Sequence, residues 1–141
     1  MDARVIVPDG FVRHDRRSAV TDPWEPLYRR LSGDMVVLGL RAGPAHCNGR
    51  GFVHGGLISA LADNAMGLSC VRRMGGLSSL VTVNLSVDFL ASALTGQWLE
   101  FDTMFVKPGG TLAFAQAFVT ADGQACARAN AVFRVVKKAA A

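Results

Sequence analysis

The sequence is poor in charge and in cysteine, and both shortages narrow the class of protein. Charged residues make up 18% of the 141 residues, whereas hydrophobic residues make up 50%. A monomer with so little charge would leave apolar surface in water, so part of that surface is predicted to lie in a subunit interface. The three cysteines, Cys47, Cys70 and Cys126, are odd in number and form no CxxC pair. This pattern argues against a disulfide framework and a zinc knuckle, and it predicts free thiols.

Segments that would direct the chain to a membrane or to nucleic acid are also missing. The first ten residues, MDARVIVPDG, lack the basic-then-apolar order of a signal peptide, and no apolar run reaches membrane-spanning length. The net charge of +4 comes from scattered basic pairs without interleaved aromatic residues. We therefore expect a cytoplasmic protein that binds neither a membrane nor nucleic acid. A small phosphorylated ligand stays compatible with this charge.

Residues 51–67, GFVHGGLISALADNAMG, are the stretch around which the chain is organised. A glycine pair is followed by an apolar run from Leu57 to Val71, in which Asp63 is the only charged residue. The run shows no polar face, so it predicts a core helix that a sheet encloses on most sides.

The remainder of the chain predicts strands around this helix. Met35–Leu40 is expected as the first strand, and residues 77–92, LSSLVTVNLSVDFLAS, alternate apolar and polar side chains throughout. Further strands are expected at residues 98–106, 112–120 and 125–136. The sequences KPGG and DG separate them as hairpin turns. One strand, a long helix and a four-stranded meander predict an α+β fold, in which an antiparallel sheet wraps around the helix.

The first 34 residues precede this pattern. Residues 1–20 carry His14 among arginines and too few apolar side chains for a core element, so they predict a peripheral arm. Four apolar residues from Trp24 to Leu31 recur at roughly helical spacing and predict a short packing helix, although Pro26 leaves its start open. The predicted division is an arm with this helix, 1–34, and a main domain, 35–138.

Two features of the central helix suggest chemistry. Amides at a helix start have no intrahelical acceptor, so Gly55 and Gly56 could present N–H groups to an anion or an oxyanion. The same pair could instead permit tight packing of the helix on a sheet. Asp63, in apolar surroundings, could act as a general base or a nucleophile. Asp63 could instead have a purely structural role. Its carboxylate would then accept hydrogen bonds from Ser or Thr hydroxyl groups, or it would point to solvent through a gap.

The loop before the helix contains polar side chains, each of which could have a structural or a catalytic role. His54 could act as an acid or base, or it could anchor the turn by a hydrogen bond, which the positive end of the helix favours. Asn48 could turn onto its own backbone or aim its amide into a cleft. His46, Cys47 and His54 lack the spacing of metal ligands, so no metal site is expected.

The loop and the helix together resemble a family signature. From His46 to Asp63 the residues HCNGRGFVHGGLISALAD are similar to the pattern HxNxxGxxHGGxxxxLxD of the PaaI-like family, hotdog-fold acyl-CoA thioesterases named after the phenylacetate pathway. The resemblance extends over about residues 35–136, because the strand pattern and the turns fall where that fold needs them.

The resemblance implies hydrolysis of an acyl-CoA thioester without a metal or an organic cofactor. It implies that the Gly55 amide, assisted by Asn48, binds the thioester carbonyl. Asp63 would activate water or attack directly, and Thr82 would help to hold that water at a position where the family often has Ser. With His54 from the motif, these residues form the candidate catalytic site.

Two rival functions share the hotdog fold. A module that binds acyl-CoA without cleaving it is the first alternative, and the costly carboxylate of Asp63 in an apolar helix argues against it. A dehydratase is the second, and it would want a histidine on the helix side of the site, which the helix lacks after His54. Three points stay open: the acyl group, whether the thioester is carried by CoA or by an acyl carrier protein, and whether water or Asp63 is the nucleophile.

The spacing of Gly55 and Asp63 predicts an assembly. Eight residues along one helix separate their backbones by roughly 12 Å, so one thioester carbonyl cannot contact both. Joint action requires a homodimer with sites at the subunit interface, and the resemblance implies that dimers pair into tetramers. Four basic residues flank the loop, the helix end and a hairpin turn, and are candidates to contact the CoA phosphates: Arg50, Arg72, Arg73 and Lys107.

Overall fold

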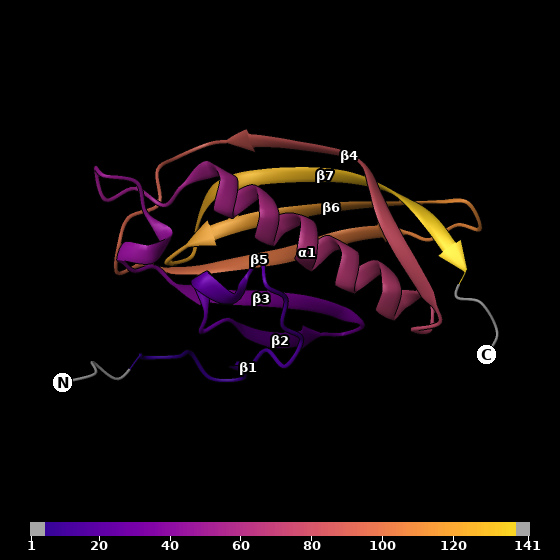
Figure 1. Cartoon of the computed structure of the whole chain (residues 1–141), viewed down its shortest axis with the longest axis horizontal. Coiled ribbons are helices and arrows are strands. Elements are labelled where there is room, and N and C mark those ends of the chain that lie inside the picture. Colours follow the sequence, from indigo (N-terminus) through magenta and orange to yellow (C-terminus); the bar gives the residue numbers. More distant parts are fainter. Residues whose placement is uncertain (1–4, 138–141) are drawn as a thin grey trace.

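The computed structural model describes residues 5–137, in which a seven-stranded antiparallel sheet curves around one long helix (Figure 1). The strands are β1 (Val12–Arg13), β2 (Tyr28–Ser32), β3 (Met35–Arg41), β4 (Ser78–Phe89), β5 (Trp98–Lys107), β6 (Leu112–Ala121) and β7 (Gln124–Lys137). Their order across the sheet is β1-β2-β3-β5-β6-β7-β4. The predicted antiparallel sheet around a central helix is therefore confirmed.

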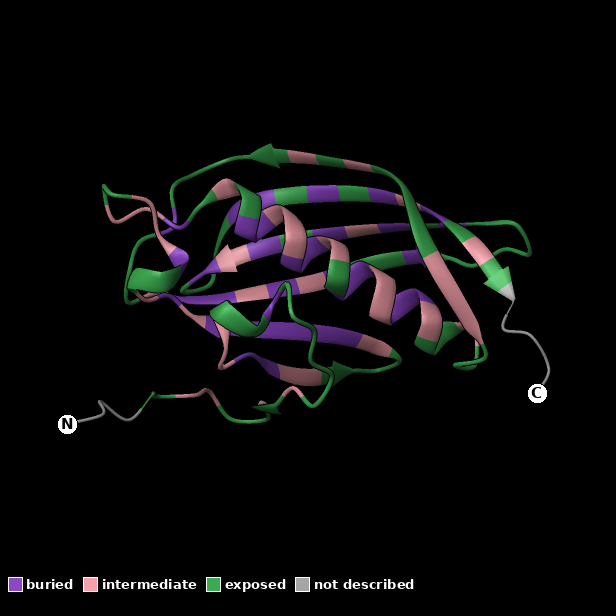
Figure 2. Cartoon of the chain, in the orientation of Figure 1, coloured by how far each residue is buried: buried purple, intermediate pink, exposed green. Residues whose placement is uncertain are grey.

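The helix, α1 (Gly55–Arg73), packs one face against the sheet. Its buried residues recur at helical spacing and many are small: Leu57, Ile58, Leu61, Ala62, Ala65, Met66, Ser69 and Cys70. Ser59, Asp63 and Gly67, on the other side, are only partly buried. The expected enclosure on most sides therefore holds for one face, and the opposite face is open to ligands. Figure 2 shows the buried residues on α1 and the central strands, while β4 is mostly exposed.

The helix expected after Thr21 is wrong. Only Asp22–Trp24 is helical, as a short 3-10 turn, and the chain then enters β2, which pairs with β3. Pro26 has no N–H and its ring crowds the preceding turn, so a helix cannot run through it. β1 pairs with β2, which places two strands before the one expected as first. The sheet thus continues across the boundary predicted at residue 35.

β4 departs from the expected alternation. Its register against β7 shifts between Thr82 and Asn84, which marks a β-bulge. Thr82, before the bulge, bonds to α1, and Leu85, after it, packs against the core. Val81 and Val83 are 56% and 59% exposed. The prediction of one apolar face throughout is wrong, because one extra residue reverses the phase of the side chains.

The last three strands form the predicted meander, but β4 does not belong to it. β5 pairs with β3 and β6, and β6 pairs with β7 across the two-residue turn Asp122-Gly123. Both turn residues have positive φ, 48° and 84°, as a tight hairpin requires. β4 lies beyond β7, so its other edge has no strand partner within residues 5–137.

Two smaller expectations concern the cysteines and membrane spans. Cys47, Cys70 and Cys126 are free thiols, as predicted. Burial raises the pKa of the Cys70 thiol to about 11, which keeps it protonated at neutral pH. Among the described residues, no helix is long and apolar enough to cross a membrane.

Candidate active site

The start of α1 is capped by the residue that precedes it. Nδ1 of His54 accepts a 2.8 Å hydrogen bond from the Gly56 amide, so the imidazole proton lies on Nε2. A Cβ at Gly56 would lie 2.9 Å from that nitrogen, which explains the second glycine. His54 therefore anchors the turn. Within the described chain, the Gly55 amide has no acceptor and is the free donor at the helix start.

The loop before α1 is fastened by two polar side chains. Oδ1 of Asn48 accepts hydrogen bonds from the amides of Arg50 (2.9 Å) and Phe52 (3.2 Å), so Asn48 turns onto its own loop. Its Nδ2 is the end that is left to donate. Nδ1 of His46 accepts from the Gly43 amide at 2.9 Å, and its Nε2 lies 2.9 Å from the Trp24 carbonyl. His46 thus ties the loop to the amino-terminal segment.

Asp63 lies in the middle of α1, where β4 crosses the helix. The Thr82 hydroxyl donates a 2.8 Å hydrogen bond to Oδ1 of Asp63. Within residues 5–137, Oδ2 of Asp63 makes no hydrogen bond, and the carboxylate is partly buried on the wall of a cavity. Asp63 is therefore held by a hydroxyl group through one oxygen and offers the other to a ligand.

The cavity beside Asp63 has a volume of about 390 Å³ and is lined in part by the amino-terminal arm. One wall comes from α1 and β4 and includes Asp63 and Thr82. The opposite wall comes from the arm: His14, Arg16, Arg17, Ser18 and Thr21. Sequence reasoning treated residues 1–20 as peripheral and missed this wall. The basic cluster was visible, but nothing in an apolar-poor segment indicated that it folds over the helix.

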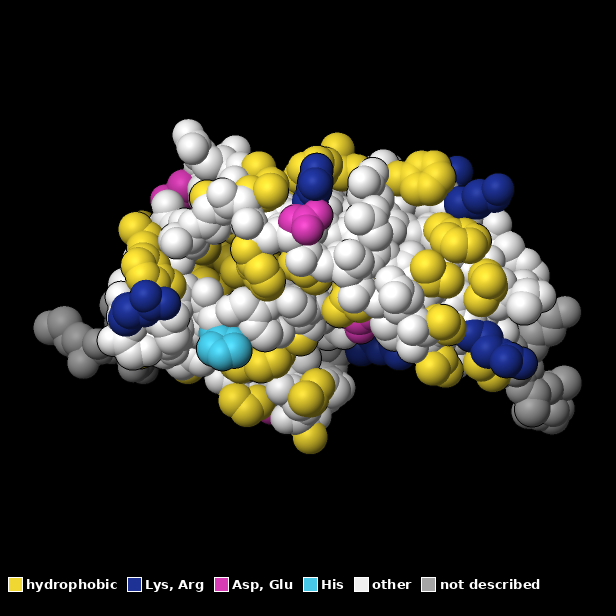
Figure 3. Space-filling model, turned by 90° about the horizontal axis from the view of Figure 1, so that it is seen from above, with side chains coloured by type: hydrophobic (Ala, Val, Ile, Leu, Met, Phe, Trp, Pro, Cys, Tyr) yellow, Lys and Arg dark blue, Asp and Glu magenta, His cyan; other side chains and the backbone are white. Residues whose placement is uncertain are grey.

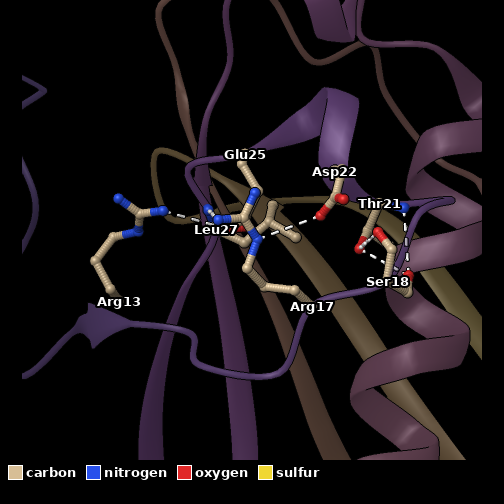
Figure 4. A network of polar contacts seen from close by, with 7 residues as sticks. All are labelled: Arg13, Arg17, Ser18, Thr21, Asp22, Glu25 and Leu27. Carbon is tan, nitrogen blue, oxygen red and sulfur yellow. Dashed lines mark hydrogen bonds and ion pairs between the residues drawn. The ribbon is translucent and has the colours of Figure 1, made fainter.

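A polar network holds the arm in place (Figure 4). Ser18 and Thr21 share a hydrogen bond of 3.0 Å between their hydroxyl groups, and Thr21 is buried. Arg17 pairs with Asp22 at 3.3 Å, and Arg13 reaches Glu25 at 3.4 Å. Side-chain bonds therefore brace the arm internally, while apolar contacts attach it to the sheet: the Phe11 and Trp98 rings pack edge to face at 5.1 Å, and Leu27 is buried in the core.

The site residues fall into two groups within one chain. Asn48, His54 and Gly55 lie at the start of α1, and Asp63 and Thr82 lie near its middle. Eight residues of helix separate Gly55 from Asp63, which is about 12 Å along the axis. A single chain thus does not bring the two groups together.

The four basic candidates also lie apart. Arg50 stacks over the Phe52 ring at 5.2 Å, near the start of α1. Arg72 and Arg73 lie at its other end, where Arg73 pairs with Asp34 at 3.3 Å. A helix of 19 residues separates the two ends by about 27 Å. Lys107 ends β5 and is exposed. These residues cannot all contact one phosphate group within one chain.

Comparison with known proteins assigns the family. Residues 50–127, more than half of the chain, match the family model described as the thioesterase superfamily. The chain belongs to this superfamily. The thioesterase is 36% identical over 130 residues to a Pseudomonas aeruginosa protein named "Putative esterase PA0474", covering 92% of this chain and 97% of that protein. It is 31% identical over 87 residues to human acyl-coenzyme A thioesterase 13, covering 60% of each.

Solved structures agree with the fold. The smu.793 protein of Streptococcus mutans, solved with acetyl CoA, has a TM-score of 0.75 against the thioesterase, with 26% identity over 90% of this chain and 98% of that one. The hotdog fold and the enzyme class of thioester hydrolase are thereby confirmed. The matched model covers the whole superfamily, so the PaaI-like subfamily stays a prediction.

Proposed function

We propose that this thioesterase hydrolyses acyl-CoA thioesters to a free acid and CoA, with Asp63 as general base or nucleophile. The observation that carries the proposal is the Asp63 carboxylate, held by Thr82 through one oxygen and facing a cavity with the other. Such a carboxylate can take a proton from water or attack a carbonyl carbon. CoA as the carrier is supported by the names of human acyl-coenzyme A thioesterase 13 and of the acetyl CoA complex.

The start of α1 supplies the complementary half of the chemistry. The free Gly55 amide, at the positive end of the helix, suits the oxygen that becomes negative when the thioester carbonyl is attacked. Nδ2 of Asn48 is a second donor at the same end. When water attacks, its proton passes to Asp63, the C–S bond breaks, and the proton leaves with the CoA thiolate as a thiol.

A homodimer would bring the Gly55 end of one helix to Asp63 of the other subunit, and β4 is the strand through which the two subunits would pair. Thr82 bonds to Asp63, while the Phe89 ring lies where a Cβ at Gly55 would be only 3.1 Å away. If the open edge of β4 paired antiparallel with its copy, with Thr82 opposite the partner's Phe89, Asp63 would approach the partner subunit's Gly55. The exposed Val81 on this strand supports such pairing. Figure 3 shows hydrophobic side chains gathered on this side of the molecule.

A second apolar surface supports the pairing of dimers into tetramers. Met104 and Phe105 of β5 and Phe114 of β6 are 58%, 52% and 41% exposed. In the dimer, Arg50 of one subunit would lie near the Gly55 end of its own helix, and Arg72 and Arg73 at the far end, so CoA phosphates could be contacted from two subunits. Their loss is expected to raise KM in a salt-dependent way.

Turnover of an acyl-CoA panel, followed by thiol release, tests the proposal. Asp63→Asn is expected to lower kcat by about 10²- to 10⁴-fold, since the amide cannot serve as a base. Asp9→Asn is the matched control, because Asp9 is an exposed carboxylate on the amino-terminal segment, outside the cavity lining. Tight binding of acyl-CoA without turnover by the unmodified protein would favour the binding module instead.

A further inference from the structure

We infer that Arg16 and His14 of the arm form an anion subsite at the far wall of the Asp63 cavity, which selects acyl groups that end in a carboxylate. This inference rests on the proposed function, because it assigns the acyl group to this cavity. It names a substrate class, the CoA thioesters of dicarboxylic acids.

Charge across the cavity is the first argument. Among the described residues that line the cavity, Asp63 is the only one with a carboxylate, whereas the arm contributes the basic residues Arg16 and Arg17. Arg17 is engaged with Asp22. Within residues 5–137, Arg16 has no carboxylate within ion-pair distance. Arg16 therefore holds an uncompensated positive charge, and a guanidinium binds a carboxylate through two parallel hydrogen bonds.

His14 provides the second argument. Its Nδ1 is buried and has no hydrogen-bond partner among residues 5–137. Burial lowers the pKa of His14; Asp15 and Glu25 oppose this effect, whereas Arg29 and Arg16 add to it. The ring is therefore neutral at pH 7 and can hydrogen-bond without adding charge. His14 also lines the cavity, so the accessible edge of its ring can form a hydrogen bond with a ligand carboxylate.

The lining and the volume of the Asp63 cavity suit an acyl chain better than a complete CoA molecule. Leu68, Leu80 and Phe133 also line this cavity and suit methylene groups. A volume of about 390 Å³ is at the lower end of small-molecule sites. An acyl chain with its thioester at Asp63 and a carboxylate at Arg16 matches the apolar and charged groups that this cavity combines.

The position of Arg16 is fixed by its neighbours. The His14 amide donates to the Leu27 carbonyl at 2.9 Å, and the Asp22 amide donates to the Ser18 carbonyl at 2.9 Å. These bonds hold the arm on both sides of Arg16. A guanidinium on a held segment loses less freedom on binding than one on a loose segment.

The test compares adipoyl-CoA with hexanoyl-CoA, which has the same length and no terminal carboxylate. The expected kcat/KM ratio favours adipoyl-CoA, and Arg16→Gln is expected to lower this ratio about tenfold or more. Arg16→Lys should retain part of the preference. Arg128→Gln removes one charge at a remote exposed site and should leave the ratio unchanged.

A CoA phosphate is the other anion that Arg16 could bind, and thioesters of N-acetylcysteamine, which lack phosphate, separate the two. Persistence of the Arg16-dependent preference with these substrates supports the acyl subsite. An equal loss for both CoA substrates, absent with N-acetylcysteamine, would assign Arg16 to CoA and overturn the inference.

A binding measurement separates failure of the inference from failure of the proposed function. Calorimetry with Asp63→Asn compares the affinities of adipoyl-CoA and hexanoyl-CoA without turnover. Absence of thioester hydrolysis by the unmodified protein would reject the proposed function alone, if the adipoyl preference in binding is kept. Equal affinities, unchanged by Arg16→Gln, would reject the subsite whether or not the protein is an active thioesterase.

Discussion

Thr82 donates a 2.8 Å hydrogen bond to Oδ1 of Asp63, across the crossing of β4 over α1. The bulge that follows Thr82 permits this contact, because the hydroxyl group faces the helix before the bulge and Leu85 faces the core after it. A strand without the bulge would turn one of these two side chains outward. The irregularity of β4 therefore positions the candidate base.

Removal of the Thr82 hydroxyl should weaken the reaction more than binding. A hydrogen bond to a charged group contributes about 1.5–3 kcal/mol, so Thr82→Val is expected to lower kcat about 10- to 100-fold. Thr82→Ser keeps the donor and should stay within a few-fold of the unmodified enzyme. Steady-state kinetics on one acyl-CoA checks both. Equal kcat values for the Val and Ser variants would show that the hydrogen bond plays no part in turnover.

Replacement of His54 is expected to lower the free energy of unfolding more than it lowers kcat. Since its Nδ1 caps α1 through the Gly56 amide, His54→Ala is expected to lower the free energy of unfolding by about 1 kcal/mol. Asn is a favoured N-cap residue, so His54→Asn should recover most of this loss. Denaturant unfolding and kcat are measured together. A stable His54→Asn enzyme with a kcat reduced a hundredfold would place His54 in catalysis.

A shared active site predicts complementation between two inactive variants. Asn48→Ala and Asp63→Asn homodimers should both be poorly active, because each site lacks one group. Exchange of subunits creates heterodimers in which one site carries both changes and the other carries neither. Activity should then recover towards about half of the sites per heterodimer. If mass measurement confirms exchange and no activity returns, both residues serve one site from a single chain.

Asp102 on β5 is expected to lower the free energy of unfolding at neutral pH. Burial raises the pKa of its carboxyl; Arg30 opposes this effect and Glu100 adds to it. At pH values above the ordinary pKa of a carboxyl group, Asp102 is therefore protonated more often in the folded chain than in the unfolded chain. Stability therefore falls as pH rises from the ordinary carboxyl pKa through the raised pKa of folded Asp102.

Replacement by the neutral isostere tests this effect. Asp102→Asn is expected to raise the melting temperature at pH 7 and to make it less sensitive to pH between 4 and 7. Asp88→Asn, at an exposed ion pair, should change the free energy of unfolding by no more than about 0.5 kcal/mol. A melting temperature for Asp102→Asn below that of the unmodified protein at pH 7 would contradict the sign.

The sequence by itself determined α1, the last three strands and the tight turn at Asp122-Gly123. Each depends on neighbours within a few residues: an apolar run bounded by glycines, alternation with period two, and residues that accept positive φ. The signature from His46 to Asp63 is equally local, which is why it indicated the family before any geometry was known.

Only the tertiary structure decided the elements whose partners are distant in the chain. Tyr28 and its neighbours fit helical spacing, but they form β2 because β3 offers a strand to pair with. β4 lies at the far edge of the sheet, where β7 pairs with it and shifts its register. Arg16 lines the Asp63 cavity because the arm, which is braced internally by polar bonds that leave no hydrophobic pattern, lies beside α1. The pairing of distant strands and the placement of the arm beside α1 depend on residues that are far apart in the chain. No short stretch of sequence contains both partners of such a contact.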